Sequence, residues 1–200
     1  MSERRIIQPP EIVDADPKLI FLADPIQGAP DWQSVVASKI HDLDPTVIVA
    51  SPRKDYEPGT FVYERQVDWE THFLRAAGRT GVIAFWLAAQ TEETPGRAYA
   101  QTTRLELGEW KARHEHREAF ITVGIEPGFG NERYIRHRFK QDIPDVKITD
   151  DIGELAANAV DLLPSLRGSL NYRKLDDRDT LVWAEDGTIE NVVPNSPLPH

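Results

Sequence analysis

The chain has 200 residues, of which 40% are hydrophobic and 28% charged, with a formal net charge of -10 and no cysteine. This length suits one domain with an appendage, and the composition is that of a soluble globular protein. The negative charge argues against a nucleic-acid-binding surface, which needs a basic stripe. The lack of cysteine excludes disulfides, thiolate metal sites and cysteine nucleophiles.

Nothing in the sequence points to a membrane or to secretion. No apolar run approaches the length of a membrane span. Residues 1–10 are polar and proline-bearing and lack the apolar segment of a signal peptide. We therefore expect a cytoplasmic protein that has no membrane partner and no nucleic-acid partner.

Short apolar runs alternate with amphipathic segments along most of the chain. The runs typical of strands buried on both faces are residues 18–23, 46–50, 81–87, 119–124 and, more weakly, 145–148. The segments between and after them that favour helices are 31–41, 64–79, a stretch starting near 101, 132–141 and 150–163. This alternation predicts an α/β fold, a flavodoxin-like doubly wound sandwich with a five-stranded parallel sheet.

The two ends of the chain differ from this pattern. Residues 1–17 are expected to form an extended N-terminal arm, and residues 18–164 the α/β domain. Residues 165–200 form a C-terminal extension, in which Glu185-Asp186-Gly187 lies between two strand-like runs. An Asp-Gly pair in that position predicts a β-hairpin appendage.

In such sheets a ligand binds at the carboxyl ends of the strands. The loop after the first strand lacks the spaced glycines or the Gly-Lys-Ser/Thr sequence of a nucleotide cofactor site, so we expect neither NAD nor ATP and no other cofactor. We also expect no metal, because His114 and His116 diverge on a helix. The same loop does carry Asp24, Gln27 and Asp31 beside Trp32, which suit polar contacts to a sugar or base and an aromatic wall.

Two glutamates are the candidate catalytic residues. Glu106 opens a predicted helix, two residues before Gly108, a glycine that would let the backbone approach a neighbour closely. The pattern Thr103-x-x-Glu106 is also a capping box, which is the structural alternative. Glu70 lies on the preceding helix one turn after Gln66, where a solvated acidic helix face is the alternative.

Taken together, these motifs resemble the nucleoside 2-deoxyribosyltransferase-like proteins, a family related to deoxynucleotide N-hydrolases. The matching segments, in order and within residues 18–160, are Ile20-Phe21-Leu22-Ala23, Ile26-x-Gly28-x-Pro30-Asp31-Trp32, Trp69-Glu70, Ile83-x-Phe85-Trp86 and Glu106-Leu107-Gly108. The fold of that family is the one predicted above.

The resemblance implies an enzyme that acts on the N-glycosidic bond of a nucleoside or nucleotide. It assigns the nucleophile to Glu106 and an assisting acid to Glu70, with Asp68 as the alternative. A helix N-terminus near Glu106 is expected to keep that carboxylate ionised. Because family members often complete their sites with a neighbouring subunit, a homo-oligomer is expected.

The candidate substrate-binding residues share a place beside the expected crevice or in the family motifs. They are Asp24, Gln27, Gly28, Asp31, Trp32, Trp69 and Asn131. For Asn131, at a boundary between loop and helix, helix capping is an equal explanation.

Two segments depart from the family pattern. The chain has Asp24-Pro25 where the family commonly has glycine, and it reads Arg97-Ala98-Tyr99-Ala100-Gln101 where the transferases carry an aspartate. The resemblance therefore implies cleavage of the glycosidic bond more strongly than transfer to a second base, and the sequence does not decide between a hydrolase and a transferase. A non-catalytic protein that binds or senses a nucleoside or nucleotide derivative on the same scaffold is the alternative.

Overall fold

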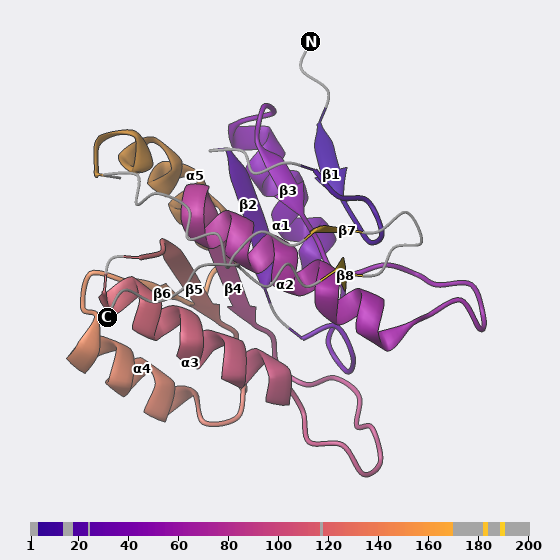
Figure 1. Ribbon diagram of the computed structural model, residues 1–200. Helices are drawn as coiled ribbons and strands as arrows, with labels where there is room; N and C mark the ends of the chain where they lie inside the picture. Colours follow the sequence, from indigo (N-terminus) through magenta and orange to yellow (C-terminus); the bar gives the residue numbers. More distant parts are fainter. Residues whose placement is uncertain are drawn as a thin grey trace, which may run out of the picture.

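A computed structural model of the protein describes residues 4–13, 18–23, 25–116, 118–169, 182–183 and 189–190. Of residues 164–169, 182–183 and 189–190 it describes the backbone alone. The predicted α/β class is confirmed, with a parallel sheet between two layers of helices (Figure 1).

The sheet has six strands, all of them parallel to their neighbours. In spatial order they are β1 (Arg5–Ile7), β3 (Ile48–Ala50), β2 (Leu19–Ala23), β4 (Val82–Leu87), β5 (Ile121–Ile125) and β6 (Ile148–Thr149). Apart from β1, this order is that of flavodoxin-like sheets, in which the direction of winding reverses beside the first strand of the unit. The reversal falls here between β2 and β4.

The predicted strand count was too low by one. Residues 5–7, expected in an extended arm, form the edge strand β1, where Ile6 pairs with Val49 of β3. Ile7 is fully buried, while Ile6 stays 44% exposed at the edge. A strand of three residues paired to a distant segment leaves little periodicity in the local sequence, which explains the error.

Five helices cover the sheet. They are α1 (Trp32–Leu43), α2 (Tyr63–Thr80), α3 (Gln101–Glu115), α4 (Glu132–Asp142) and α5 (Ile152–Ser169). α1 and α5 pack on one face, and α2, α3 and α4 on the other (Figure 1). Among the described residues, no helix has the length and apolar character needed to cross a bilayer.

The two central strands explain why the sequence shows continuous apolar runs. Every residue of β2 and β4 is buried. Successive side chains alternate between the faces, so Ile20 and Leu22 pack toward α1 and α5, while Phe21 packs toward α2 and α3. A strand covered on both faces therefore needs apolar residues at every position.

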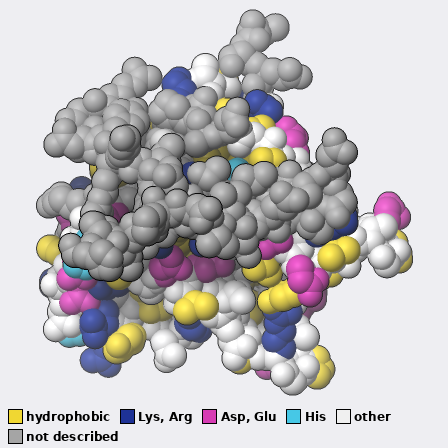
Figure 2. Space-filling view, viewed as in Figure 1, with side chains coloured by type: hydrophobic (Ala, Val, Ile, Leu, Met, Phe, Trp, Pro, Cys, Tyr) yellow, Lys and Arg dark blue, Asp and Glu magenta, His cyan; other side chains and the backbone are white. Residues whose placement is uncertain are grey.

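Outside the sheet, β7 (Val182–Trp183) and β8 (Ile189–Glu190) pair antiparallel within the C-terminal extension. The turn predicted between them, Glu185-Asp186-Gly187, lies outside the described residues. On the molecular face in Figure 2, acidic, basic and hydrophobic side chains of the described residues are interspersed, as on an ordinary globular surface.

Candidate active site

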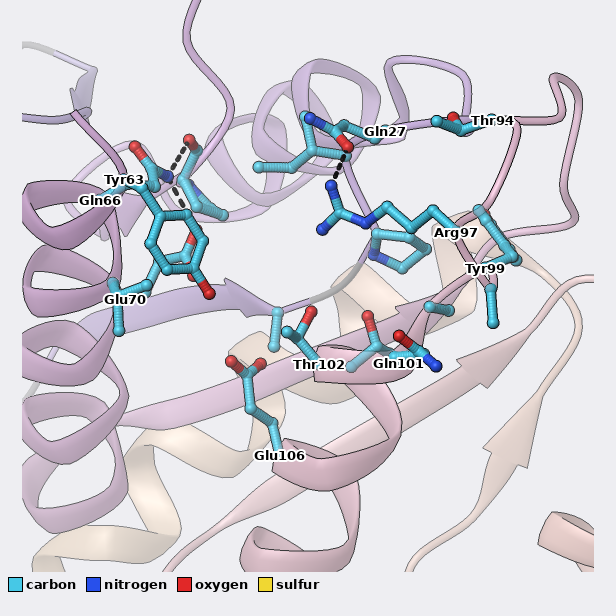
Figure 3. A pocket seen from close by; sticks show the side chains of 18 of the residues that line it. Gln27, Tyr63, Gln66, Glu70, Thr94, Arg97, Tyr99, Gln101, Thr102 and Glu106 are labelled. Atoms are coloured by element: carbon cyan, nitrogen blue, oxygen red, sulfur yellow. Dashed lines mark hydrogen bonds between the residues drawn. The ribbon is translucent and has the colours of Figure 1, made fainter. Parts of the chain in front are cut away.

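A cavity of about 420 Å³ opens at the carboxyl edge of the sheet, beside the point where the strand order reverses. Its walls come from the β2–α1 loop, the β3–α2 loop, the β4–α3 loop and the facing sides of α2 and α3 (Figure 3). This is the position at which open α/β sheets bind ligands, and the volume lies in the range of small-molecule pockets.

The two candidate catalytic glutamates both line this cavity. Glu70 comes from α2 and Glu106 from α3, and both side chains point into the same space (Figure 3). The alternative acid, Asp68, lies on α2 but does not line the cavity. Helix α2 therefore presents Glu70, and not Asp68, to Glu106.

Glu70 is held by a chain of hydrogen bonds. Gln66 donates from Nε2 to Oε1 of Glu70 at 2.7 Å and to the carbonyl of Pro52 at 3.0 Å. The amide oxygen of Gln66 accepts a hydrogen bond of 2.6 Å from the Tyr56 hydroxyl. Burial raises the pKa of the Glu70 carboxyl, and the hydrogen bond from Gln66 partly opposes that rise.

Glu106 differs from Glu70 in having no hydrogen bond to any side chain in Figure 3. Burial, together with the negative charges of Glu70 and Glu109, raises the pKa of Glu106 to about 8. At neutral pH the ligand-free pair therefore holds a proton, mainly on Glu106.

The expectation that a helix N-terminus keeps Glu106 ionised was wrong. α3 begins at Gln101 after Ala100, which has a left-handed backbone (φ 55°) and no side-chain cap. Glu106 thus lies in the second turn, beyond the reach of the first free N–H groups, and the Thr103 capping box does not form. Burial against another carboxyl group decides the protonation instead.

Helices α2 and α3 approach each other through a glycine, but not through the predicted one. A Cβ atom at Gly78 of α2 would overlap the ring of Trp110 of α3. Among the described residues nothing lies within 4 Å of a Cβ placed at Gly108, so its expected role in close approach was wrong. The contact between Gly78 and Trp110 lets the two glutamate-bearing helices lie close together.

The aromatic wall of the cavity is made of tyrosine and phenylalanine. The aromatic side chains in the lining are Phe21, Tyr56, Phe61, Tyr63 and Tyr99. Trp32 and Trp69, predicted to lie near the ligand, are 2% and 1% exposed and do not line the cavity. They pack under α1 and α2 against opposite faces of the sheet, where burial of a large aromatic surface outweighs access to a ligand.

Fewer of the predicted residues of the β2–α1 loop line the cavity than expected. Gln27 lines the cavity, and its side-chain oxygen accepts a hydrogen bond from Arg97. Gly28 does not line it; with φ 76°, its carbonyl accepts hydrogen bonds from Thr91 and Glu92, which fasten the β4–α3 loop. Asp24 lies outside the described residues.

Asp31 has a structural role in place of the predicted ligand contact. It caps α1 by accepting a hydrogen bond of 3.1 Å from the Ser34 backbone N–H, and it forms an ion pair of 3.4 Å with Arg53. Arg53 also donates to the carbonyls of residues 26, 29 and 30. This arginine clamps the loop whose residues 25–27 line the cavity.

Asn131 also does not line the cavity. It precedes α4 in a left-handed conformation (φ 65°), and its side chain makes no capping hydrogen bond. A left-handed residue is most often glycine, with asparagine the next choice. Backbone conformation therefore explains Asn131 where neither substrate contact nor side-chain capping does.

Sequence reasoning missed the two cations of the cavity wall, Lys54 and Arg97, and the tyrosines around them. Each lies between a predicted strand and the next predicted helix, and the composition of such a segment does not indicate which side chains turn inward. The one available signal was the departure at residues 97–101, where the family pattern has an acid and this chain has Arg97.

No family model matches the chain, and comparison with curated proteins finds no match. The relation to nucleoside 2-deoxyribosyltransferase-like proteins is therefore a proposal based on the motifs and on the geometry of the cavity.

Proposed function

We propose that the protein cleaves or transfers the N-glycosidic bond of a nucleoside or nucleotide, with Glu106 as nucleophile and Glu70 as its acid partner. One observation carries this proposal: two partly buried carboxyl groups from different helices, each with a raised pKa, converge in a cavity at the topological switch point. Enzymes that cleave glycosidic bonds usually use a pair of carboxyl groups, one protonated and one ionised.

The hydrogen bonds of the pair support this division of roles. Gln66 occupies one oxygen of Glu70, whereas the Glu106 carboxyl faces the cavity without a partner among the side chains drawn in Figure 3. A carboxylate placed beneath an anomeric carbon stabilises the positive charge that develops there. The unpartnered group is the one free to approach that carbon.

The proton held by Glu70 and Glu106 is then transferred to the leaving base. On substrate binding the Glu106 proton passes to Glu70, and the resulting Glu106 carboxylate attacks the anomeric carbon. The bond between that carbon and the base nitrogen breaks with its electron pair on the nitrogen, which takes the proton from Glu70. The products of this half-reaction are a free base and a glycosyl ester on Glu106.

The second half-reaction decides between hydrolysis and transfer. If water attacks the ester, its oxygen bonds to the anomeric carbon and the bond from that carbon to Glu106 breaks. One proton of the water returns to the pair and a free sugar leaves. If the nitrogen of a second base attacks, it bonds to the anomeric carbon while the bond from that carbon to Glu106 breaks. The nitrogen loses its proton to the pair and a new nucleoside forms. In both cases the base would lie against the tyrosine and phenylalanine side chains of the cavity wall.

The test is a chromatographic screen of nucleosides and their 5′-monophosphates, with and without an acceptor base, for wild type and Glu106→Gln. We expect base release by wild type, a loss of at least about a thousandfold in the variant, and a trapped glycosyl ester on Glu106 by mass spectrometry. Glu93→Gln, an exposed loop substitution outside the cavity, is the matched control.

Full activity in a folded Glu106→Gln variant would exclude Glu106 as the nucleophile. An ester trapped on Glu70 would reverse the two roles. Tight binding of nucleosides without turnover by wild type would favour the sensing protein over the enzyme.

A further inference from the structure

The N-terminal segment, residues 4–13, is bonded to the start of the β3–α2 loop, which follows Ala50. The backbone N–H of Ser51 donates a hydrogen bond of 2.9 Å to the carbonyl of Ile7, which extends the pairing of β1 with β3 into the loop. Gln8 donates from Nε2 to the carbonyl of residue 53 at 2.6 Å. The path of the loop is therefore fixed by the segment where it leaves the sheet.

The N-terminal segment is itself well anchored. Ile7 is fully buried, and Ile12 and Val13 pack against the core between the sheet and α2. Trp69 of α2 donates from Nε1 to the carbonyl of Glu11 at 2.7 Å. The segment thus joins the edge of the sheet to α2, the helix that carries the acid of the site.

Lys54 connects this segment to Tyr56. Its Nζ donates a hydrogen bond of 2.7 Å to the carbonyl of Pro9, and it lies over the Tyr56 ring, 5.5 Å from the ring centroid. An ammonium group at that distance is attracted to the face of an aromatic ring. The Tyr56 side chain is therefore held at its ring by Lys54 and at its hydroxyl by Gln66, to which it donates at 2.6 Å.

The same loop supplies both of the groups that orient the Gln66 amide. Its oxygen accepts from Tyr56, and its nitrogen donates to the carbonyl of Pro52 at 3.0 Å. The nitrogen also donates to Glu70 at 2.7 Å, on the α2 side of the cavity (Figure 3). Because Gln66 is buried, its amide depends on these partners for hydrogen bonds. A continuous chain of contacts therefore leads from Pro9 to Glu70.

The last contact of this chain acts on the protonation of Glu70. Burial raises the pKa of Glu70, and the hydrogen bond from Gln66 lowers it. Burial, and then the charge of Glu70, raises the pKa of Tyr56. The ionisable side chains that line the cavity with Glu70 are Lys54, Tyr56, Tyr63, Arg97, Tyr99 and Glu106. The positions of Gln66 and Tyr56 therefore bear on the charge state of Glu70.

We propose that the N-terminal segment, acting through Lys54, is a positioning element of the site that fixes the hydrogen bond between Gln66 and Glu70. None of residues 4–13 lines the cavity, so the segment acts only through the β3–α2 loop. The use of this position in base release rests on the proposed function. The effect on Glu70 in the ligand-free protein does not.

The test is an NMR titration of the side-chain carboxyl carbons in the ligand-free, full-length protein. Gln8→Ala and Lys54→Met each remove one side-chain hydrogen bond between the segment and the loop. The proton affinity of Glu70 should rise about twofold in each variant and about fivefold in the double variant, because the Gln66 amide is then less well oriented. Gln8 is uncharged and lies outside the cavity, so a shift in Gln8→Ala reports the position of the loop and not a lost charge.

Three further variants serve as controls. Lys54→Arg keeps a donor for the carbonyl of Pro9 and a cation over the Tyr56 ring, so it should restore the wild-type titration. Gln141→Ala and Lys140→Met make the same changes at exposed positions of α4 and should leave the titration unchanged.

An unchanged Glu70 titration in the double variant, folded by circular dichroism, would overturn the proposal. If the double variant does not fold, the two single variants decide, since each loses only one hydrogen bond. A shift in Lys54→Met with none in Gln8→Ala would also overturn it, because the charge of Lys54 and not the position of the loop would then act on Glu70.

The failures of the two proposals are distinguishable. With a substrate found by the screen, Gln8→Ala should lower kcat about twofold to threefold with KM unchanged, and move the acid limb of the pH profile to higher pH. If Glu70 shifts in Gln8→Ala but no base is released from any nucleoside or nucleotide, the positioning role stands and the glycosidic reaction falls. If Glu106 is needed for base release while Gln8→Ala keeps the wild-type kcat and Glu70 titration, the reaction stands and the positioning role falls.

Discussion

Gln66 donates a hydrogen bond from its amide nitrogen to the Glu70 carboxyl at 2.7 Å, on the same face of α2. The orientation of that amide is decided by Tyr56, whose hydroxyl donates to the amide oxygen at 2.6 Å. With the oxygen engaged, the nitrogen must face Glu70. The arrangement favours the ionised form of Glu70, so the proton of the pair resides mainly on Glu106.

These hydrogen bonds, from Tyr56 to Gln66 and from Gln66 to Glu70, predict the effect of Gln66→Leu. Without the amide donor the pKa of Glu70 rises further, because burial is no longer opposed. The acid limb of the kcat/KM profile against pH should therefore move to higher pH, by about one unit if the lost interaction is worth about 1.4 kcal/mol. Tyr56→Phe should move it less, since the amide can stay in place. An unshifted limb in a folded Gln66→Leu protein would show that the hydrogen bond does not control the pair.

The wild-type profile itself should be bell-shaped. The proposed reaction needs one proton on the pair, so kcat/KM should fall when Glu106 ionises, near pH 8 in the free protein. It should fall again on the acid side when Glu70, whose pKa is also raised, takes up a second proton. Rates measured between pH 4 and 10 with one substrate check both limbs. A profile that stays flat through pH 8 would exclude Glu106 as the titrating group.

The α/β fold and the two glutamates that line the cavity could be predicted from the sequence, but the other side chains that line it could not. Glu70 and Glu106 stand on long helices between buried strands, so periodicity and topology place them at one edge of the sheet. The protonation of Glu106 depends first on its burial in the assembled fold and then on the charge of Glu70 from another helix, and no local pattern reveals either. Trp32 and Trp69 are of a residue type that often lines binding sites, yet the packing of α1 and α2 on the sheet buries them.

Burial of Glu106 should cost stability that a neutral side chain recovers. Below pH 4.5 this carboxyl group is protonated in both the folded and the unfolded chain. As the pH rises from 4.5 toward about 8, only the folded protein keeps the proton, and stability is lost over that range. Glu106→Gln should therefore raise the free energy of unfolding by about 2 kcal/mol at pH 7, with little gain at pH 4. Denaturant unfolding at both pH values measures this.

Glu93→Gln removes the same charge from an exposed loop position and should leave the free energy of unfolding unchanged at either pH. A Glu106→Gln protein that is less stable than wild type at pH 7 would contradict the buried, protonated state of this carboxyl.

The contact between Gly78 and Trp110 should control the spacing of the two acids. In Gly78→Ala the added Cβ overlaps the indole ring, so α2 and α3 must move apart at a cost of about 2 kcal/mol. The charge of Glu70 then acts on Glu106 from farther away, and the alkaline limb of the kcat/KM profile should move to lower pH. Gly108→Ala, on the exposed side of α3, should instead gain roughly 0.5 to 1 kcal/mol from helix propensity and leave the profile unchanged. If Gly78→Ala lost stability with no shift of the limb, helix spacing would not set the coupling between Glu70 and Glu106.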